Sequence, residues 1–127
     1  MADTNKLGRV GWVDLTVDAA VTVRDFYQAV AGFEVLPIDM GGYEDFCLLP
    51  PGGGDPVAGV CHARGSNAEL PPVWLVYFTV ADVKASAQTA LDLGGRVLVA
   101  PRPLSGGLFT VIADPAGAIC ALFQPPT

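Results

Sequence analysis

The stretch VGWVDLTV at residues 10–17 returns 63 residues later as VWLVYFTV at residues 73–80. This overlay places Thr16 on Thr79 and Val17 on Val80. With an offset of 62, further residues coincide: Gly32 with Gly94, Val35 with Val97 and Leu36 with Leu98. Self-similarity at a fixed spacing indicates a duplicated structural unit. The sequence therefore predicts two similar halves, neither of which holds a complete core alone.

Glycine and proline residues divide each half into short segments of strand length and one longer apolar segment. In the first half we expect strands at about residues 10–17, 33–40, 43–49 and 56–62, and a helix that includes residues 24–31. In the second half we expect strands at about residues 73–80, 96–101, 107–113 and 117–124, and a helix at residues 82–93. Each half is thus predicted to be β-α-β-β-β.

The two predicted helices have apolar residues at helical spacing, which indicates one buried face on each. In the first helix these residues are Val23, Phe26, Tyr27 and Val30; in the second they are Val83, Ala87, Ala90 and Leu91. Asp18 is the predicted N-cap of the first helix, and Gly32 its predicted end.

Composition excludes several classes of protein. The 127 residues are 51% apolar and 16% charged, which is typical of one folded domain and not of a disordered chain. The net charge of −6 comes without a basic stripe, so we expect neither nucleic acid nor an anionic membrane as a partner. The longest uncharged apolar stretch, residues 73–80, is too short to span a bilayer.

The location of the protein is predicted from its first residues and its cysteines. The polar N-terminus lacks the apolar region of a signal peptide. The three cysteines, Cys47, Cys61 and Cys120, are an odd number without metal-type spacing. We therefore expect reduced thiols in a cytoplasmic protein.

Six segments in this order resemble the glyoxalase/bleomycin-resistance/extradiol-dioxygenase superfamily, also called vicinal oxygen chelate proteins. They are DLTV at residues 14–17, RDFY at 24–27, GFEV at 32–35, FTVADV at 78–83, LGG at 93–95 and DPAG at 114–117. The resemblance covers about residues 8–125. It implies one α+β domain over residues 1–127, with module one at about 8–62, a linker at 63–72 and module two at about 73–125. The modules would form a cupped mixed β-sheet with the helices outside, commonly as a homodimer.

Strand alternation predicts which side chains face such a cup, since successive side chains point to opposite faces. The apolar faces are expected to meet the helices, and the mixed faces to line the cup. From the first half these cup residues are Trp12, Asp14, Thr16, Tyr43, Asp45 and Cys47; from the second they are Leu75, Tyr77, Thr79, Leu108, Thr110, Ile119, Ala121 and Phe123. Phe46, Leu48, Phe109 and Val111 are expected to face the helices.

The fourth strand allows two registers. Either Ala58, Val60 and His62 face the cup, or Val57, Gly59 and Cys61 do. We favour the first register because it spares the single histidine an apolar burial.

A polar wall that faces an apolar wall is typical of a small-molecule pocket. The predicted ligand-binding residues are Trp12, Asp14, Tyr43, Asp45, Cys47, His62, Tyr77 and Arg102. The alternative is that these positions are barrel filling with ordinary hydrogen bonds.

The resemblance implies a divalent metal held by His and Glu on four strands. Its positions fall on Trp12, Leu75, Ala121 and, depending on the register, Val60 or Cys61. Apart from the possible Cys61 thiol, these side chains offer no suitable donor. One histidine also cannot supply a two-histidine facial triad. We therefore expect no metal and no other cofactor.

Two functions remain open at this point. The first is a binding protein that sequesters an aromatic or cationic compound, as the bleomycin-resistance branch of the superfamily does. The second is an enzyme of lyase, isomerase or dioxygenase type. It would use His62 with Asp14 or Asp45 as catalytic residues, or a divalent metal held by relocated ligands.

Overall fold

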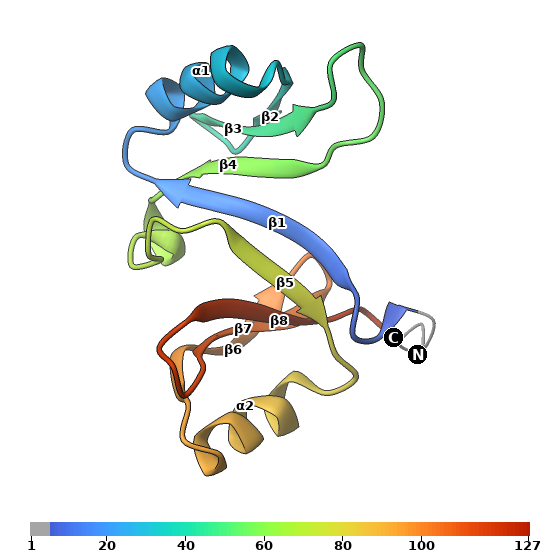
Figure 1. Cartoon of the computed structure of the whole chain (residues 1–127), viewed down its shortest axis with the longest axis vertical. Helices are drawn as coiled ribbons and strands as arrows, with labels where there is room; N and C mark the ends of the chain where they lie inside the picture. Colours follow the sequence, from blue (N-terminus) through green and yellow to red (C-terminus); the bar gives the residue numbers. More distant parts are fainter. Residues whose placement is uncertain (1–5) are drawn as a thin grey trace. The chain divides into compact units, whose positions relative to one another are not determined.

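The order of helices and strands confirms the predicted α+β fold with two tandem βαβββ modules. The computed structural model describes residues 6–127. The first module comprises β1 (Val10–Val17), α1 (Ala20–Ala31), β2 (Glu34–Asp39), β3 (Glu44–Leu49) and β4 (Ala58–His62), followed by the short 3₁₀ helix η2 (Gly65–Asn67). The second comprises β5 (Leu75–Thr79), α2 (Val83–Asp92), β6 (Arg96–Leu104), β7 (Gly107–Ala113) and β8 (Ile119–Gln124) (Figure 1).

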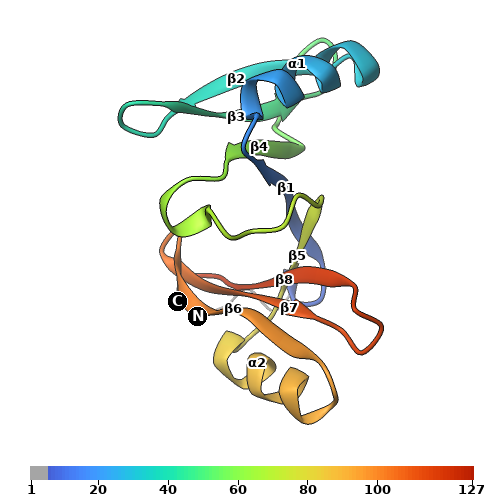
Figure 2. The same cartoon turned by 90° about the vertical axis from the view of Figure 1, so that its left-hand side faces the viewer.

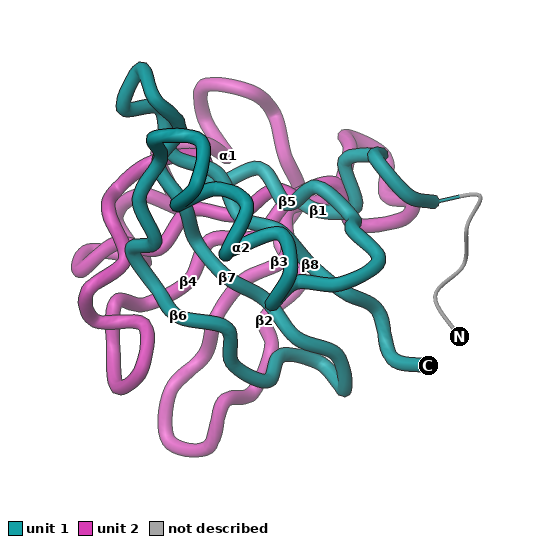
Figure 3. Tube along the Cα trace, turned by 90° about the horizontal axis from the view of Figure 1, so that it is seen from below, with its two compact units in different colours: residues 1–12, 75–127 teal, residues 13–74 magenta. Residues whose placement is uncertain are grey.

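The chain divides into two compact units, which are described separately. Unit 1 comprises Met1–Trp12 and Leu75–Thr127, and unit 2 comprises Val13–Trp74 (Figure 3). The division falls inside β1 because the chain at its start bonds to β5. The amide of Gly8 donates to the carbonyl oxygen of Thr79 at 2.7 Å, and the amide of Thr79 donates to Arg9 at 2.9 Å.

In unit 2 the strands lie in the order β2, β3, β4, β1, with β1 parallel to β4 and the other neighbours antiparallel. Helix α1 covers one face of this sheet. The core beneath it consists of Ala20, Phe46, Leu48, Ala58 and Val60, surrounded by the partly buried Val13, Val17, Val23, Phe33, Val35 and Trp74. The predicted direction of Phe46 and Leu48 is therefore confirmed.

Helix α1 presents a different face to this core from the one predicted. Phe26 and Val30 are 55% and 64% exposed, whereas Ala20 is fully buried. The helix starts at Ala20, and this small side chain lets its first turn lie close to the sheet. The predicted N-cap was also wrong: Ala19 occupies that position, without a side-chain hydrogen bond. The predicted end is confirmed, since Gly32 closes the helix with a φ of 74°.

In unit 1 the strands lie in the order β5, β8, β7, β6, with β5 parallel to β8 and the other neighbours antiparallel. Helix α2 lies against one side of this sheet (Figure 2). Its buried residues are Val83 and Ala87, as predicted, but Leu91 is 50% exposed. The side chain of Asp82 caps the helix by accepting from the amide of Ala85 at 3.0 Å. No helix among residues 6–127 is both long and apolar enough to cross a membrane.

The register of unit 1 corrects the predicted facing of β5 and β8. Tyr77 pairs with Ala121, and Ala121 pairs with Val111, so all three share one face. This face is the buried one. It comprises Leu75, Tyr77, Thr79, Phe109, Val111, Ala113 and Ala121, all at most 6% exposed. We assign it to the α2 side. The expectation that Leu75, Tyr77, Thr79, Ile119, Ala121 and Phe123 face the opposite side from Val111 was therefore wrong.

Candidate functional site

His62, at the end of β4, contacts the carboxylate of Asp45 on β3. The Oδ1 atom of Asp45 accepts the backbone amide of His62 at 2.9 Å and lies 3.3 Å from its ring Nδ1. The two side chains are 19% and 11% exposed, so the pair is mostly buried with a small part open to solvent. Asp14 and Asp45 were the two carboxylates predicted as partners of His62, and the one that contacts it is Asp45.

Two further rings hold the imidazole in place. Tyr43 meets it edge-on at 5.5 Å between ring centroids, and Phe46 lies at 6.1 Å. Each of these rings carries an arginine on its face: the guanidinium of Arg64 lies 3.9 Å from the Tyr43 centroid, and that of Arg24 lies 4.6 Å from the Phe46 centroid. A row of alternating rings and cations therefore surrounds His62.

The carboxylates of Asp14 and Asp45 lie beside the thiol of Cys61, on the sheet face opposite α1. Asp14 and Cys47 both pair with Gly59, two residues before Cys61 on β4, and Thr16 pairs with Cys61 itself. Burial raises the pKa of the Cys61 thiol well above its usual range, and the charges of Asp14 and Asp45 raise it further. The thiol also hydrogen-bonds to Asp45. Cys61 therefore keeps its proton, which makes it a poor nucleophile.

The other two cysteines are also free thiols. Burial raises the pKa of Cys47, and burial together with the charge of Asp114 raises the pKa of Cys120. Neither thiol has the lowered pKa of a reactive cysteine.

The favoured register of β4 was wrong. Ala58 and Val60 pack into the core under α1, so Cys61, rather than these two residues, shares a face with Asp14. His62 lies at the strand end, where its ring contacts Phe46 and its backbone amide and ring Nδ1 face Asp45. The core gains apolar contacts from Val60 and Ala58, and this outweighs the half-burial of a histidine that has found a carboxylate partner.

Sequence reasoning missed Arg64, Phe46 and Cys61 as neighbours of His62. The signal for Arg64 was its position two residues after His62, where it follows the end of β4. The signal for Cys61 was the other β4 register. Phe46 was expected only to fill the core.

The remaining predicted ligand-binding residues belong to unit 1. Trp12 is the last residue of β1 that belongs to unit 1, and it is partly buried. Tyr77 is 6% exposed and packs against Phe109 at 6.3 Å between ring centroids. The guanidinium of Arg102 lies 5.0 Å from the Phe109 centroid. Tyr77 and Arg102 therefore meet at Phe109, on the buried side of the sheet, which makes Tyr77 a packing residue.

The residues at the expected metal positions do not fit a divalent ion. Val60 and Ala121 are fully buried hydrocarbon side chains, and Leu75 is 3% exposed. Cys61 has a donor atom, but its raised pKa disfavours the thiolate that binds metals. Among residues 6–127, no group of three or more His, Cys, Asp or Glu side chains is placed to hold an ion.

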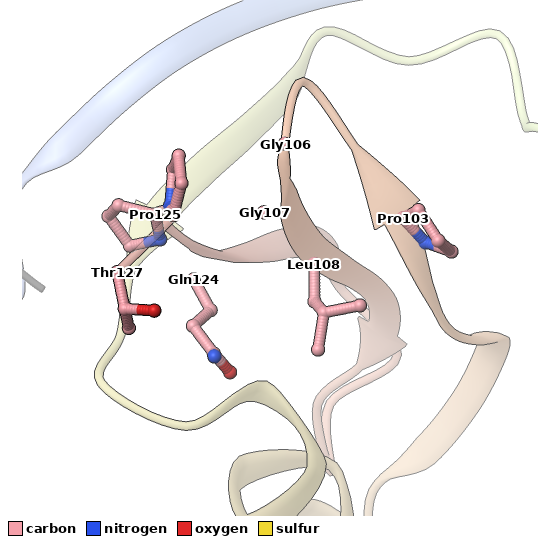
Figure 4. A pocket seen from close by; sticks show the side chains of 8 residues that line it. Pro103, Gly106, Gly107, Leu108, Gln124, Pro125 and Thr127 are labelled. Atoms are coloured by element: carbon pink, nitrogen blue, oxygen red, sulfur yellow. The ribbon is translucent and has the colours of Figure 1, made fainter. Parts of the chain in front are cut away.

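A shallow hollow of about 310 Å³ lies elsewhere, between the β6–β7 hairpin and the C-terminal residues of unit 1 (Figure 4). Leu108 and Gln124 are among its lining residues. None of the predicted ligand-binding residues lines it. The amide oxygen of Gln124 accepts the amide of Val83 at 2.9 Å, so this side chain ties β8 to α2.

Comparison with known proteins agrees with the duplicated fold. The sequence model of the Glyoxalase/Bleomycin resistance protein/Dioxygenase superfamily matches residues 9–121. The chain belongs to this superfamily. Among its relatives is CFP32 of Mycobacterium tuberculosis, a candidate glyoxylase, which is 32% identical over 122 residues. Another is the anthracycline biosynthesis protein DnrV of Streptomyces peucetius, 35% identical over 111 residues.

The matched regions are only part of these superfamily members. The alignment with CFP32 covers 95% of this chain and 46% of that protein, and the one with DnrV covers 87% and 39%. The chain thus spans about half the length, or less, of the curated relatives it matches.

Solved structures support the superfamily fold. Methylmalonyl-CoA epimerase of Streptomyces coelicolor has a TM-score of 0.58 at 24% identity, over 95% of this chain and 99% of that one. A hypothetical protein of Bacillus halodurans has the same TM-score at 12% identity, over 94% and 95% of the two chains. At these identities the likeness concerns the fold and not the substrate.

Proposed function

We propose that the protein binds a small cationic or aromatic compound at the acidic face of unit 2, without a metal ion. The observation that carries this proposal is the grouping of Asp14, Asp45 and the protonated Cys61 on one sheet face. Two carboxylates near one thiol create a negative potential, which favours a positively charged ligand.

The distribution of charge supports a cationic ligand. Residues 13–74 carry nine of the 13 acidic side chains and two of the seven basic ones, a net charge of −7, while the rest of the chain has four acidic and five basic residues, a net charge of +1. The two basic residues do not cancel the acidic face. Arg24 is paired with Asp25 at 2.8 Å, and Arg64 is stacked on Tyr43.

Aromatic recognition is supported by the rings beside the carboxylates. Tyr43 and His62 stand edge to face and are both partly exposed. Such rings stack on flat ligands. A relative named for anthracycline biosynthesis makes an anthracycline a suitable probe.

The test is titration with daunorubicin, which joins a flat ring system to a protonated amine, and with its aglycone, which lacks the amine. We expect daunorubicin to bind more tightly than the aglycone, and its affinity to fall as salt rises because the attraction is ionic. Asp14→Asn and Asp45→Asn should each weaken binding, whereas the matched variant of the exposed Asp55 should not. Equal affinity of both compounds for all proteins, or no binding, would refute the cationic site.

Metal analysis of the purified protein tests the metal-free part of the proposal. We expect no stoichiometric divalent ion, and no change in melting temperature or daunorubicin affinity on addition of a chelator. A bound ion whose removal abolishes daunorubicin binding would contradict it.

The Asp45–His62 contact favours one alternative, an enzyme of lyase or isomerase type. A histidine oriented by a carboxylate is a common general base. If daunorubicin or another probe is converted with time, and His62→Gln stops the conversion, the protein is an enzyme rather than a binding protein.

A further inference from the structure

Among residues 6–127, one ring nitrogen of His62 has no hydrogen-bond partner. Nδ1 faces Asp45, the backbone amide donates to the same carboxylate, and the ring edges contact Tyr43 and Phe46. Within residues 6–127, Nε2 makes no hydrogen bond. The side chain is 19% exposed, so the ring is not sealed off from solvent.

The partner of Nδ1 determines where the proton of the neutral ring lies. A carboxylate only accepts hydrogen bonds, so the nitrogen that faces it must carry the proton. In the neutral imidazole the other nitrogen then has a free lone pair. Asp45 therefore fixes the Nδ1–H form and leaves Nε2 as an acceptor.

Protein donors already contact Asp45. Its Oδ1 accepts from the amide of His62 at 2.9 Å and lies 3.3 Å from the ring Nδ1, and the carboxylate also receives the thiol of Cys61. These contacts make Asp45 a positioning residue for the ring. Beside this carboxylate, Nε2 of His62 is a second, neutral acceptor for a ligand.

We propose that Nε2 of His62 accepts a hydrogen bond from the ligand, so that the site selects protonated amines over quaternary ammonium ions. This inference rests on the proposed function, because it specifies the cation bound at the acidic face. A protonated amine supplies an N–H donor as well as positive charge, whereas a quaternary ammonium supplies charge alone. His62 is thus the specificity-determining residue of the site.

The first experiment needs no ligand. Nitrogen NMR shifts of the ring report which nitrogen carries the proton. We expect the Nδ1–H form in the wild type and in Asp45→Asn, whose side-chain oxygen still accepts the proton. Asp45→Ala should shift His62 toward the Nε2–H form that prevails in water, while Asp55→Ala should leave it unchanged. An Nε2–H form in the wild type overturns the inference, whatever the variants do.

The second experiment compares daunorubicin with its N-trimethyl quaternary derivative. A hydrogen bond to a charged group predicts about tenfold tighter binding of the protonated amine. In His62→Phe, which keeps a ring between Tyr43 and Phe46 but has no acceptor, this ratio should fall to about one, and the variant also controls for the bulk of the methyl groups.

The two failures are distinguishable. If both compounds bind the wild type equally well, the inference is wrong and the cationic site stands. If neither binds, the proposed function is wrong and the inference fails with it. An unchanged tenfold preference in His62→Phe would assign selectivity to another residue.

Discussion

Cys61 shows how the environment of one residue follows from strand register. Its neighbours Asp14 and Asp45 were predicted to share a face, and this is confirmed by the pairing of β1, β4 and β3. The place of Cys61 between them was not predicted, because alternation along β4 fits two registers equally well. The deciding contacts are those of Val60 and Ala58 with the α1 core, which are long-range and invisible in the segment itself.

The raised pKa of Cys61 makes a prediction for stability at alkaline pH. The folded protein keeps this proton above the ordinary thiol value of 9.0, whereas the unfolded chain loses it there. Stability is therefore fully present below that pH and falls as the pH rises above it. Urea unfolding at increasing pH should show this fall in the wild type, and a smaller fall in Cys61→Val.

Cys47→Val is the matched control, because burial alone raises the pKa of Cys47 and no carboxylate contributes. It should retain more of the wild-type pH dependence than Cys61→Val. Identical pH profiles for wild type and Cys61→Val would contradict the assigned environment of Cys61.

At the scale of elements, the periodic segments were predictable and the facing of some strands was not. The helices and strands lie close to their expected bounds because glycine and proline end each segment. The error in β5 arose from the expectation that the more apolar face of each strand meets the helices. The overlay of the halves, which placed Thr16 on Thr79, agreed with that facing. In the sheets, Leu15 pairs with Val60, and Thr79 with Phe123.

Val60 and Phe123 both pair with the equivalent phenylalanines of β3 and β7, Phe46 and Phe109. Thr79 is therefore the structural counterpart of Leu15 and not of Thr16. A shift of one residue exchanges the two faces of a strand. The sequence overlay of β1 and β5 therefore differs by one residue from their equivalence in the structure, and it did not reveal that Leu75 and Tyr77 lie on the buried face.

The helix N-termini make a prediction at the same scale. Asp82 accepts the amide of Ala85, so Asp82→Ala should destabilise the protein by about 1 kcal/mol. Asp82→Ser should restore most of that loss. Asp18→Ala is the control. Because no side chain caps α1, this change should leave the free energy of unfolding, measured with urea, nearly unchanged. A similar loss in both alanine variants would contradict the assigned caps.

For the whole molecule, the sequence predicted the duplication, the superfamily and a cup with one polar and one apolar wall. The overlay rests on apolar and glycine positions, which are similar in both modules. The charged residues are not similar, since nine of the 13 acidic side chains lie in residues 13–74. A duplicated scaffold with one strongly acidic unit is consistent with a ligand site built mainly from that unit.

This charge imbalance predicts that screening stabilises the protein. Repulsion within unit 2 weakens as salt rises, so the melting temperature should increase with sodium chloride.

Asp39 and Glu44 are directly paired across β2 and β3, where like charges oppose each other. Glu44→Gln should raise stability by about 0.2–1 kcal/mol and reduce the gain from salt. Lys84→Gln in unit 1 should do neither, because its surroundings carry little net charge. A melting temperature that falls with salt in the wild type, or an equal effect of both variants, would show that repulsion in unit 2 does not limit stability.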